Sequence, residues 1–267
     1  MSQRPPKRRA SGEPSGAGQP ASAVRMRSVG EQGLAVELGE AIDPEVNARV
    51  HWLARAVASR CGSEVIELVP SYRSVLVVHD PLRVSRVHLE TVIREVLADL
   101  PRDPAIGSAG RLVHVPACYG GQLGPDLEAV TRDRGLTPEE AIALHSGATY
   151  RVYMLGFTPG FPYLGGLPAR LATPRLDVPR QLVEAGSIGI AGEQSGIYPV
   201  ASPGGWRLIA RTPLRLFDPS AAAPFLFAAG DRVRFEPIDA SRFEQIAAGV
   251  AAGTFAPSIE SGTGAVR

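Results

Sequence analysis

The sequence predicts an α+β protein made of a small N-terminal α+β domain and a second domain built mainly of short strands. With 267 residues, 44% of them hydrophobic, the chain can bury a substantial core and has the length of one large or two ordinary domains. Strand and helix patterns follow the order ββαββα in the first part of the chain, whereas short strands separated by turns dominate the second part. We therefore expect a tail at 1–23, domains at 24–105 and 110–240, and a C-terminal helix and tail at 241–267.

The first domain shows clear start and stop signals. Asp43 is a suitable N-cap and Pro44 a suitable first residue for a helix that runs to about Cys61, because apolar residues recur at helical spacing between them. The other predicted elements of this domain are strands at 24–30, 33–39, 64–70 and 74–80 and an amphipathic helix at 84–99. Pro101 to Pro104 and Gly107 to Gly110 are typical of a linker.

The second domain begins with a predicted strand at 111–119 and a short helix from Pro125-Asp126. Thr137 and Glu140 form a capping box around Pro138, so a second helix starts there, and Gly147 is a candidate left-handed cap at its end. The following runs predict strands at 149–156, 187–192, 197–201, 206–211, 214–218 and 231–238, with a last helix at 241–251. This density of short strands favours a β-barrel or a sandwich.

Composition excludes several classes of function. The formal net charge of +1 argues against a nucleic-acid partner, which usually requires a basic patch. Lys7 is the only lysine, so the folded region has no Schiff-base lysine, no biotinyl-lysine and no P-loop lysine. Cys61 and Cys118 are too few for a disulfide framework, and we expect both to be small buried residues in a reducing, cytoplasmic protein. No zinc-ligand spacing and no apolar run long enough to span a membrane occurs.

The most informative segment runs from Gly156 to Gly205. It contains ten glycines and seven prolines, too many for helices or regular strands, yet aromatic and aliphatic residues recur throughout. Such a segment is typical of ordered loops on a rigid scaffold, where binding groups usually lie.

His145 precedes this segment and is the first candidate catalytic residue. It lies at a predicted helix end, and histidine can act as acid or base near neutral pH. The alternative is a structural interaction with the helix C-terminus, where a cation is favoured.

Arg175 and Arg180 each follow a proline, which restricts the backbone before the arginine. We expect this pair to bind a carboxylate or a phosphate and to act in catalysis, the alternative being two surface arginines. Arg211 is a third candidate cation. Further candidates for substrate binding are Tyr150, Gln194, Ser202 and Trp206. The glycine-rich backbone at Gly186, Ser187, Gly189 and Gly192 is a candidate anion or cofactor site, although the glycine pattern taken alone favours tight barrel turns.

Several motifs resemble one family. These are VPSYRSVLVVHDP, ACYGGQLGPDL, GFTPGFPYLGGLP, the TPR and VPR arginines, GSIGIAGEQSGIYPVASPGGW and RTPLRLFD, which together cover about Met26 to Pro237. They are similar to the family that contains the 5-oxoprolinase B subunit, the sporulation-kinase inhibitor KipI and allophanate hydrolase subunit 1. The resemblance implies a cyclophilin-like β-barrel for the second domain. One departure is Gln122, where the family has an acidic residue.

The resemblance also implies a function. It predicts a component of an ATP-dependent 5-oxoprolinase that opens 5-oxoproline to glutamate, together with a larger homologous C-type subunit and a third, A-type subunit, with ATP bound by this chain or elsewhere in the complex. The alternatives are a carboxyltransferase subunit of a urea-amidolyase-like system, with biotin on a partner, and a non-catalytic inhibitor of a sensor histidine kinase. Prolyl isomerase activity is a weaker option, because a shared fold does not imply a shared site.

Overall fold

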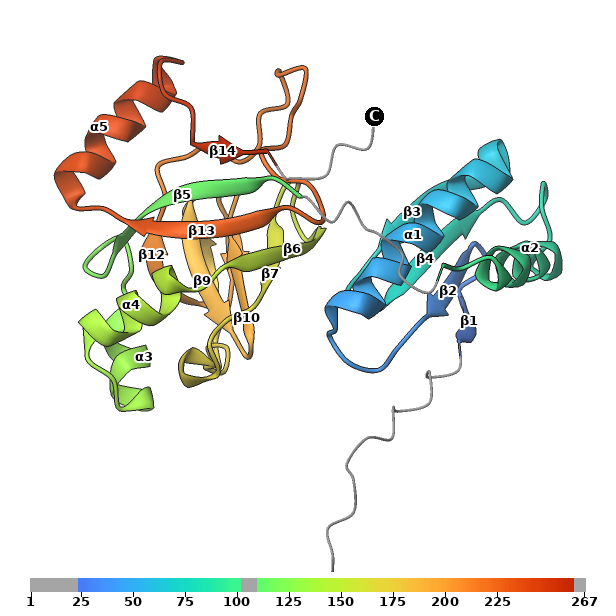
Figure 1. Cartoon of the computed structure of the whole chain (residues 1–267), viewed down its shortest axis with the longest axis horizontal. Coiled ribbons are helices and arrows are strands. Elements are labelled where there is room, and N and C mark those ends of the chain that lie inside the picture. Colours follow the sequence, from blue (N-terminus) through green and yellow to red (C-terminus); the bar gives the residue numbers. More distant parts are fainter. Residues whose placement is uncertain (1–23, 102–109, 262–267) are drawn as a thin grey trace, which may run out of the picture.

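The computed structural model describes residues 24–101 and 110–261. The predicted N-terminal tail, most of the predicted linker and the last six residues lie outside these ranges. Figure 1 shows the two parts of the chain, an open sheet with two helices and a barrel with helices around it.

The N-terminal domain has the predicted ββαββα order. Its elements are β1 (Arg25–Val29), β2 (Gly33–Glu37), α1 (Pro44–Cys61), β3 (Val65–Pro70), β4 (Ser74–His79) and α2 (Arg86–Ala98). The four strands form an antiparallel sheet in the order β1-β2-β4-β3. The apolar faces of α1 and α2 pack with the inward residues of β2 and β4 into one core, which explains the alternating burial of β4.

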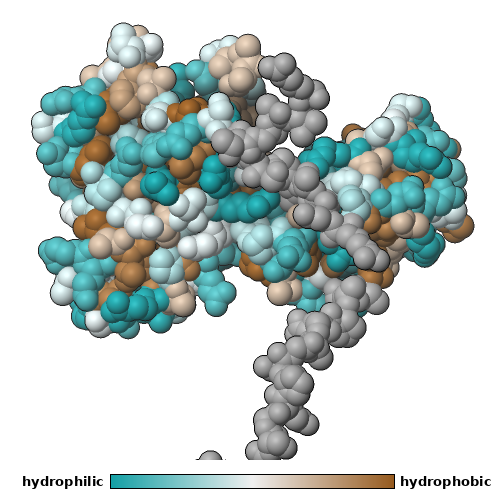
Figure 2. All heavy atoms as spheres, viewed as in Figure 1, coloured by the Kyte–Doolittle hydropathy of each residue, from teal (hydrophilic) through white to brown (hydrophobic). Residues whose placement is uncertain are grey.

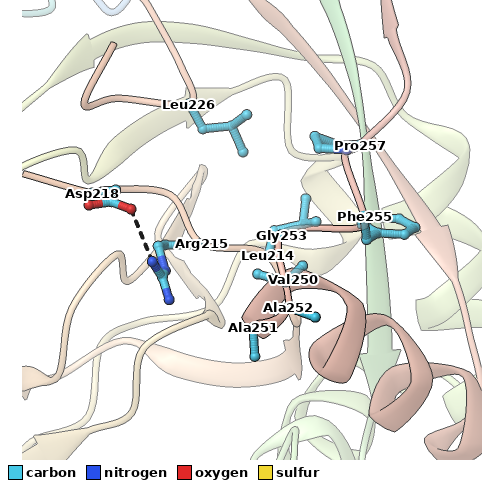
Figure 3. Close-up of a pocket in the computed structure, with 10 residues that line it drawn as sticks. All are labelled: Leu214, Arg215, Asp218, Leu226, Val250, Ala251, Ala252, Gly253, Phe255 and Pro257. Carbon is cyan, nitrogen blue, oxygen red and sulfur yellow. Dashed lines mark hydrogen bonds and ion pairs between the residues drawn. The ribbon is translucent and has the colours of Figure 1, made fainter. Parts of the chain in front are cut away.

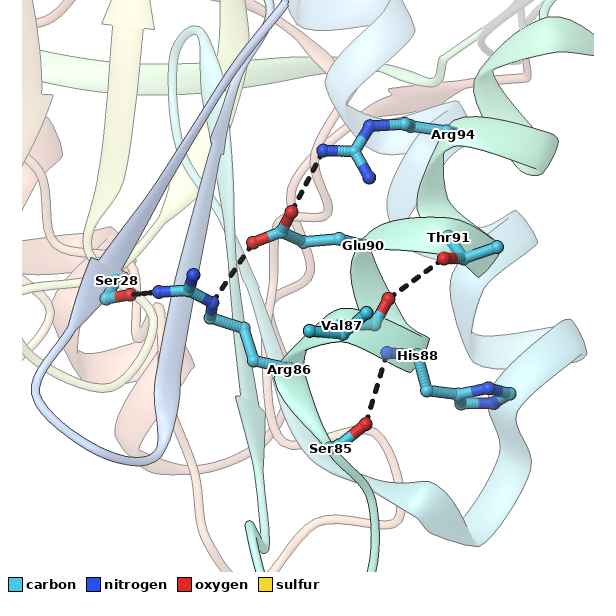
Figure 4. A network of polar contacts seen from close by, with 8 residues as sticks. All are labelled: Ser28, Ser85, Arg86, Val87, His88, Glu90, Thr91 and Arg94. Carbon is cyan, nitrogen blue, oxygen red and sulfur yellow. Dashed lines mark hydrogen bonds and ion pairs between the residues drawn. The ribbon is translucent and has the colours of Figure 1, made fainter.

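A side chain caps each helix of this domain, and the cap at Asp43 was predicted. The Asp43 carboxylate accepts hydrogen bonds from two backbone N–H groups of the first turn of α1. Ser85 caps α2 in the same way (Figure 4). On the exposed face of α2, Glu90 lies between Arg86 and Arg94, at 3.1 and 2.9 Å, and Arg86 also reaches Ser28 on β1. Such exposed pairs stabilise a helix by only about 0.3–0.5 kcal/mol each, so the apolar core determines this packing.

The second domain is a closed barrel. Its strands are β5 (Leu112–Tyr119), β6 (Tyr150–Leu155), β7 (Pro162–Gly165), β9 (Ser187–Ala191), β10 (Gln194–Ile197), β12 (Arg207–Arg211) and β13 (Arg232–Pro237). They follow the order β12-β9-β10-β7-β6-β13-β5, and pairing of β12 with β5 closes the barrel. The predicted α+β fold class with a β-barrel is therefore confirmed.

Three helices lie outside the barrel: α3 (Leu127–Arg134), α4 (Pro138–Gly147) and α5 (Ala240–Ala251) (Figure 1). The capping box of Thr137 and Glu140 is present at the start of α4. The predicted left-handed cap at Gly147 is wrong, because Gly147 is the last residue of the helix and the next residue, Ala148, has an extended conformation.

The strand predictions fail where loops carry apolar residues. Of the run predicted at 197–201, only Ile197 lies in a strand, as the last residue of β10, and residues 214–218 form only an isolated bridge between Phe217 and Phe225. Four short strands were not predicted: β7, β8 (Arg180–Val183), its partner β11 (Ser202–Gly204), and β14 (Ile259–Glu260). β14 lies in the segment predicted as a polar tail, and it pairs with β5 on the barrel.

The surface of both domains is mixed. On the face shown in Figure 2, apolar residues are interspersed with hydrophilic ones. Cys61 and Cys118 are buried, as predicted. Within the ranges that the structure covers, none of the helices combines the length and the apolar character needed to cross a bilayer.

Candidate functional site

An aromatic pocket lies on the outside of the barrel. Ile188 and Ile190 of β9 belong to the barrel core, whereas Ala191 belongs to a smaller cluster that contains several aromatic residues. Because neighbouring strand residues point to opposite faces, this second cluster covers the outer face of β9. The pocket has a volume of about 260 Å³, and its walls are formed by Phe157, Phe161, Tyr163, Arg175, Pro179, Tyr198, Pro203, Gly204, Gly205 and Trp206.

The rings of this pocket form one contact network. Phe161 is its centre, with ring centroids 4.9 Å from Tyr163, 5.1 Å from Tyr198 and 5.5 Å from Trp206. The Tyr198 and Trp206 contacts are edge-on, the geometry that aromatic quadrupoles favour. Packing between these rings therefore holds the pocket walls in fixed positions.

Glycine is required beneath these rings. A Cβ atom on Gly196 would lie 2.7 Å from Phe161 and 2.9 Å from Trp206, and one on Gly204 would lie 2.3 Å from the Tyr198 hydroxyl. Both glycines therefore make room for aromatic side chains. This explains part of the glycine content that the sequence alone associated with turns or anion binding.

Arg175 is the one predicted catalytic residue that lines the pocket. Its guanidinium lies 5.8 Å from the centroid of the Trp206 ring, within the range of a cation–π contact. Among the residues that the structure describes, no carboxylate lies within ion-pair distance of Arg175. Burial raises the pKa of Tyr163 and of Tyr198, and the positive charge of Arg175 partly opposes both shifts. The pocket thus combines apolar walls with one cation that has no acidic partner in the described chain.

Arg180 has a different environment. It donates to the Asp126 carboxylate at 2.7 Å and to the Trp206 carbonyl at 3.4 Å. Its charge is therefore already neutralised, and the expectation that Arg175 and Arg180 form a free anion-binding pair is not what the structure shows. Arg180 instead ties β8 to the start of α3.

Asp126 is a residue whose role the sequence did not reveal. Its position before a helix predicts a capping side chain, but its carboxylate makes no cap hydrogen bond. One oxygen binds Arg180 and the other accepts from the backbone N–H of Leu208 at 2.6 Å. Asp126 is only 7% exposed, so it connects three parts of the second domain from a buried position.

His145 lies in the barrel core. It is fully buried, stacks on Phe235 with centroids 4.5 Å apart, and is absent from the walls of the aromatic pocket. The predicted catalytic residue His145 therefore lies away from this pocket. Burial lowers its pKa to about 3, so the imidazole is neutral at neutral pH.

The hydrogen bonds of His145 form a directed chain. The Ser195 hydroxyl donates to the Gly189 carbonyl at 3.3 Å, so it accepts from Nε2–H of His145, also at 3.3 Å. The Nδ1 atom then accepts from the Tyr119 hydroxyl at 2.7 Å. Tyr150, a predicted substrate-binding residue, is fully buried and donates to the His145 carbonyl. Each polar group of this hydrogen-bond network has a partner, so the network can be buried in the barrel without leaving a polar group unpaired.

The remaining predicted residues are dispersed over the barrel. Gln194 lies in a different pocket of about 270 Å³, near Ile42 and Tyr153. Ser202 is buried and its hydroxyl has no hydrogen-bond partner among residues 24–101 and 110–261. Arg211 donates to the Ala185 carbonyl at 2.8 Å. Of the predicted substrate-binding set, Trp206 alone lines the aromatic pocket.

The glycine-rich backbone directs its N–H groups to partners inside the barrel. Those of Gly186 and Gly192 donate to the carbonyls of Tyr198 and Thr173, each at 2.7 Å, and that of Ser187 donates to Glu184. Gly189 lies inside β9, between β10 and β12. These donors hold barrel turns and strand pairs, the simpler of the two interpretations that the sequence left open.

Phe157 was not predicted as a site residue, and its backbone is unusual. It is the one non-glycine residue with a positive φ, 66°, in the described chain, and its side chain is 63% exposed at the mouth of the pocket. A bulky residue in this region is strained, and such strain is found preferentially at functional sites. The sequence signal was present, since Phe157 lies between a glycine and the Thr-Pro-Gly turn.

A second, larger hollow lies at the C-terminal end of α5 (Figure 3). Its volume is about 460 Å³, and most of its lining residues have apolar side chains, with the exposed ion pair of Arg215 and Asp218 at 3.0 Å on one side. The lining residues that the structure describes include no histidine, no cysteine and no cation without a partner. The aromatic pocket is therefore the better candidate for a functional site.

The comparisons with known proteins agree with the motifs. The family model described as carboxyltransferase domain, subdomain C and D, matches residues 24–227. The chain belongs to this carboxyltransferase-domain family. A carboxyltransferase-domain relative from Bacillus subtilis (strain 168), named as the B subunit of 5-oxoprolinase, is 42% identical over 222 residues, which cover 79% of this chain and 91% of the relative. A protein of the same name from Escherichia coli O157:H7 is 40% identical, over 80% of this chain and 96% of the relative.

Solved carboxyltransferase-domain structures support the fold. The crystal structure of TTHA0988 has a TM-score of 0.68 and 38% identity, over 78% of this chain, which spans 40% of that larger protein. The crystal structure of K. lactis urea amidolyase has a TM-score of 0.74 over 89% of this chain and 16% of that protein. At 22% identity, this second likeness shows the shared fold alone.

Proposed function

We propose that this chain is the B subunit of a 5-oxoprolinase, which opens the lactam ring of 5-oxoproline to give glutamate. The observation that carries the proposal is the identity of 42% and 40% to two proteins with that name, over 91% and 96% of their lengths. The aromatic pocket supports it, because 5-oxoproline is a small, nearly planar ring with one carboxylate.

In this proposal the pocket binds the substrate and Arg175 binds its carboxylate. The rings of Phe161, Tyr163 and Trp206 offer flat apolar surfaces to the lactam ring. Arg175 has no competing acidic partner in the described chain, so its guanidinium is available for a bidentate contact with a carboxylate. We assign His145 and Arg180 to the stability of the barrel, because their polar groups are satisfied within the protein.

The residues of the pocket do not fit ATP. Pockets for drug-sized ligands typically have volumes of about 300–1,000 Å³, whereas the volume of this pocket is about 260 Å³. A nucleotide is at least as large as such a ligand, so the pocket is too small for it. No P-loop lysine exists, and the glycine-rich N–H groups are engaged within the barrel. We therefore propose that the ATP of the complete enzyme binds to another subunit.

The relatives are named as one subunit of an enzyme, so we expect this chain to have a surface on which a partner subunit docks. Phe157, which lines the pocket, is 63% exposed, and Val178 and Leu182, which flank the lining residue Pro179 in the sequence, are 81% and 59% exposed. A partner subunit that covered them would exclude water from the pocket and complete the site. We propose the larger C-type subunit for this role and an A-type subunit as the third component.

The test is reconstitution. The chain is purified with the candidate partner subunits, and ATP hydrolysis is measured with and without 5-oxoproline, together with glutamate formation. Hydrolysis that depends on 5-oxoproline and on this chain is expected. Transfer of label from bicarbonate to urea in place of glutamate formation would show that the carboxyltransferase alternative is correct.

A further inference from the structure

The N-terminal domain contacts the barrel at a residue that lines the aromatic pocket. Tyr72 lies in the turn between β3 and β4, and its ring packs against two barrel residues, Tyr153 on β6 and Tyr163 on β7, with centroids 5.3 and 5.8 Å away. Tyr163 is a wall of the pocket and lies 6.0 Å from Trp206. Tyr72 is therefore one ring removed from the proposed ligand.

Two polar residues of α1 bind the turn that carries Tyr72 and the barrel strand β6. Asn47 and His51 are four residues apart, so they share one face of the helix, and both are buried. The Asn47 amide donates to the carbonyls of Ser71 and Tyr72, at 3.1 and 3.3 Å, which fixes the turn.

His51 acts across the domain boundary. Its Nε2–H donates to the Tyr153 carbonyl at 2.7 Å, and burial lowers the pKa of this imidazole, which favours the neutral form. One helix face therefore holds both the Tyr72 turn of its own domain and the barrel strand that Tyr72 contacts.

The Tyr72 side chain is held by ring contacts. Its hydroxyl is buried and has no hydrogen-bond partner within the described part of the chain. A buried hydroxyl without a partner is unfavourable, so the aromatic ring must account for the presence of this residue.

We propose that Tyr72 is a positioning residue for the aromatic pocket, through which the N-terminal domain holds Tyr163 and thereby Trp206 in the geometry that binds the ligand. The identity of the ligand rests on the proposed function, whereas the role of Tyr72 in holding Tyr163 and Trp206 does not depend on it. Without Tyr72, the Tyr163 ring loses one of the rings that pack against it and gains rotational freedom. The pocket then binds more weakly, while the chemistry of the bound substrate is unchanged.

The first measurement needs no enzyme activity. Trp52 and Trp206 are the two tryptophans, so Trp52→Phe leaves Trp206 as the only tryptophan, whose emission is excited at a wavelength where tyrosine does not absorb. In that background, Tyr72→Ala is expected to shift the Trp206 emission to the red and to increase acrylamide quenching about twofold, since the wall opens to water. Tyr72→Phe keeps the ring and should leave both values unchanged. Leu82→Ala is the matched control, because Leu82 lies in the same domain and is 95% exposed.

The second measurement uses the reconstituted enzyme. Tyr72→Ala is expected to raise KM for 5-oxoproline about tenfold with little change in kcat, as for a misplaced binding wall, and Tyr72→Phe should restore the wild-type KM. If Tyr72→Ala does not fold, as judged by circular dichroism, Tyr72→Leu keeps apolar volume without the ring and replaces it in both measurements.

Unchanged Trp206 emission and quenching in folded Tyr72→Ala or Tyr72→Leu would overturn the inference. Equal damage by Tyr72→Phe would also overturn it, because the hydroxyl and not the ring would then be responsible. If the wild-type complex shows no activity with 5-oxoproline, the proposed function fails, and the fluorescence measurement still decides the role of Tyr72.

Discussion

The second domain contains two kinds of polar group with opposite properties, those with partners inside the protein and one that lines an open pocket. His145 in the barrel core, and the pair of Asp126 and Arg180 outside the barrel, are hydrogen-bonded within the protein. In the pocket, Arg175 has an aromatic neighbour but no acidic one among the described residues. The sequence placed Arg175, Arg180 and His145 in a single site. The difference teaches that an internal partner, and not residue type, separates a structural charge from one available to a ligand.

The strongest test of the enclosed region is His145→Ala. The substitution leaves a cavity and removes the partner of the Tyr119 hydroxyl, so the free energy of unfolding is expected to fall by about 3 kcal/mol or more. Urea denaturation measures this value. A loss below about 1 kcal/mol would contradict the enclosed role of His145.

The same residue predicts an acid dependence. Its folded pKa of about 3 lies below the ordinary value of 6.5, so below pH 6.5 the unfolded chain binds a proton that the folded protein does not. His145 thus costs stability as pH falls from 6.5 toward 3, by up to about 1.4 kcal/mol per unit. A difference in slope between the wild type and His145→Gln in urea titrations at several pH values measures this contribution, and identical slopes would exclude it.

The pair of Asp126 and Arg180 is the next largest expected effect. Asp126→Asn leaves Arg180 without its counter-charge, and we expect a loss of about 2–3 kcal/mol in the free energy of unfolding. Arg180→Ala should cost less, because Arg180 is more exposed than its partner. Thermal and urea unfolding check both values. If Asp126→Asn is as stable as the wild type, Arg180 does not depend on its internal counter-charge, and the contrast with Arg175 fails.

Arg175→Ala is expected to show the reverse pattern. Its stability should remain within about 0.5 kcal/mol of wild type. The value of kcat/KM for 5-oxoproline should fall about 10- to 100-fold, because a charge-assisted contact with the carboxylate is lost. Arg175→Lys keeps the charge but not the bidentate geometry, and should be intermediate. Full activity in Arg175→Ala would remove the pocket's anion-binding role.

The smallest predicted effect concerns the edge of the barrel. His114 contacts Glu236 and Glu260 at 2.7 and 2.8 Å, which attaches β14 to the barrel. The bond to Glu260 raises the pKa of His114, burial opposes this, and the bond to Glu236 adds to the rise. The stabilisation is therefore complete below pH 6.5 and is lost as pH rises through the raised pKa. Glu260→Gln should cost about 0.5 kcal/mol near pH 6 and almost nothing near pH 9, measured by urea unfolding at both values.

The sequence by itself determined the features that depend on neighbours along the chain. The ββαββα order, the Asp43 cap and the capping box at Thr137 rest on contacts within a few residues, so local patterns predicted them. The short strands β7, β8 and β11 were not predicted, because glycine and proline lie within or beside them. β7 finds its partners in the barrel, and β8 and β11 pair with each other in a separate two-stranded sheet. The motifs also determined the family, since they occur together in the right order.

The tertiary structure alone decided which candidate residues belong to the site. Asp126 lies 54 residues from Arg180, Ser195 lies 50 residues from His145, and His51 lies 102 residues from Tyr153. Each of the two arginines follows a proline, Pro174 or Pro179, but the fold brings a carboxylate to Arg180 and an indole ring to Arg175. Charge pairing and burial act through space, so no pattern along the chain could separate the two arginines.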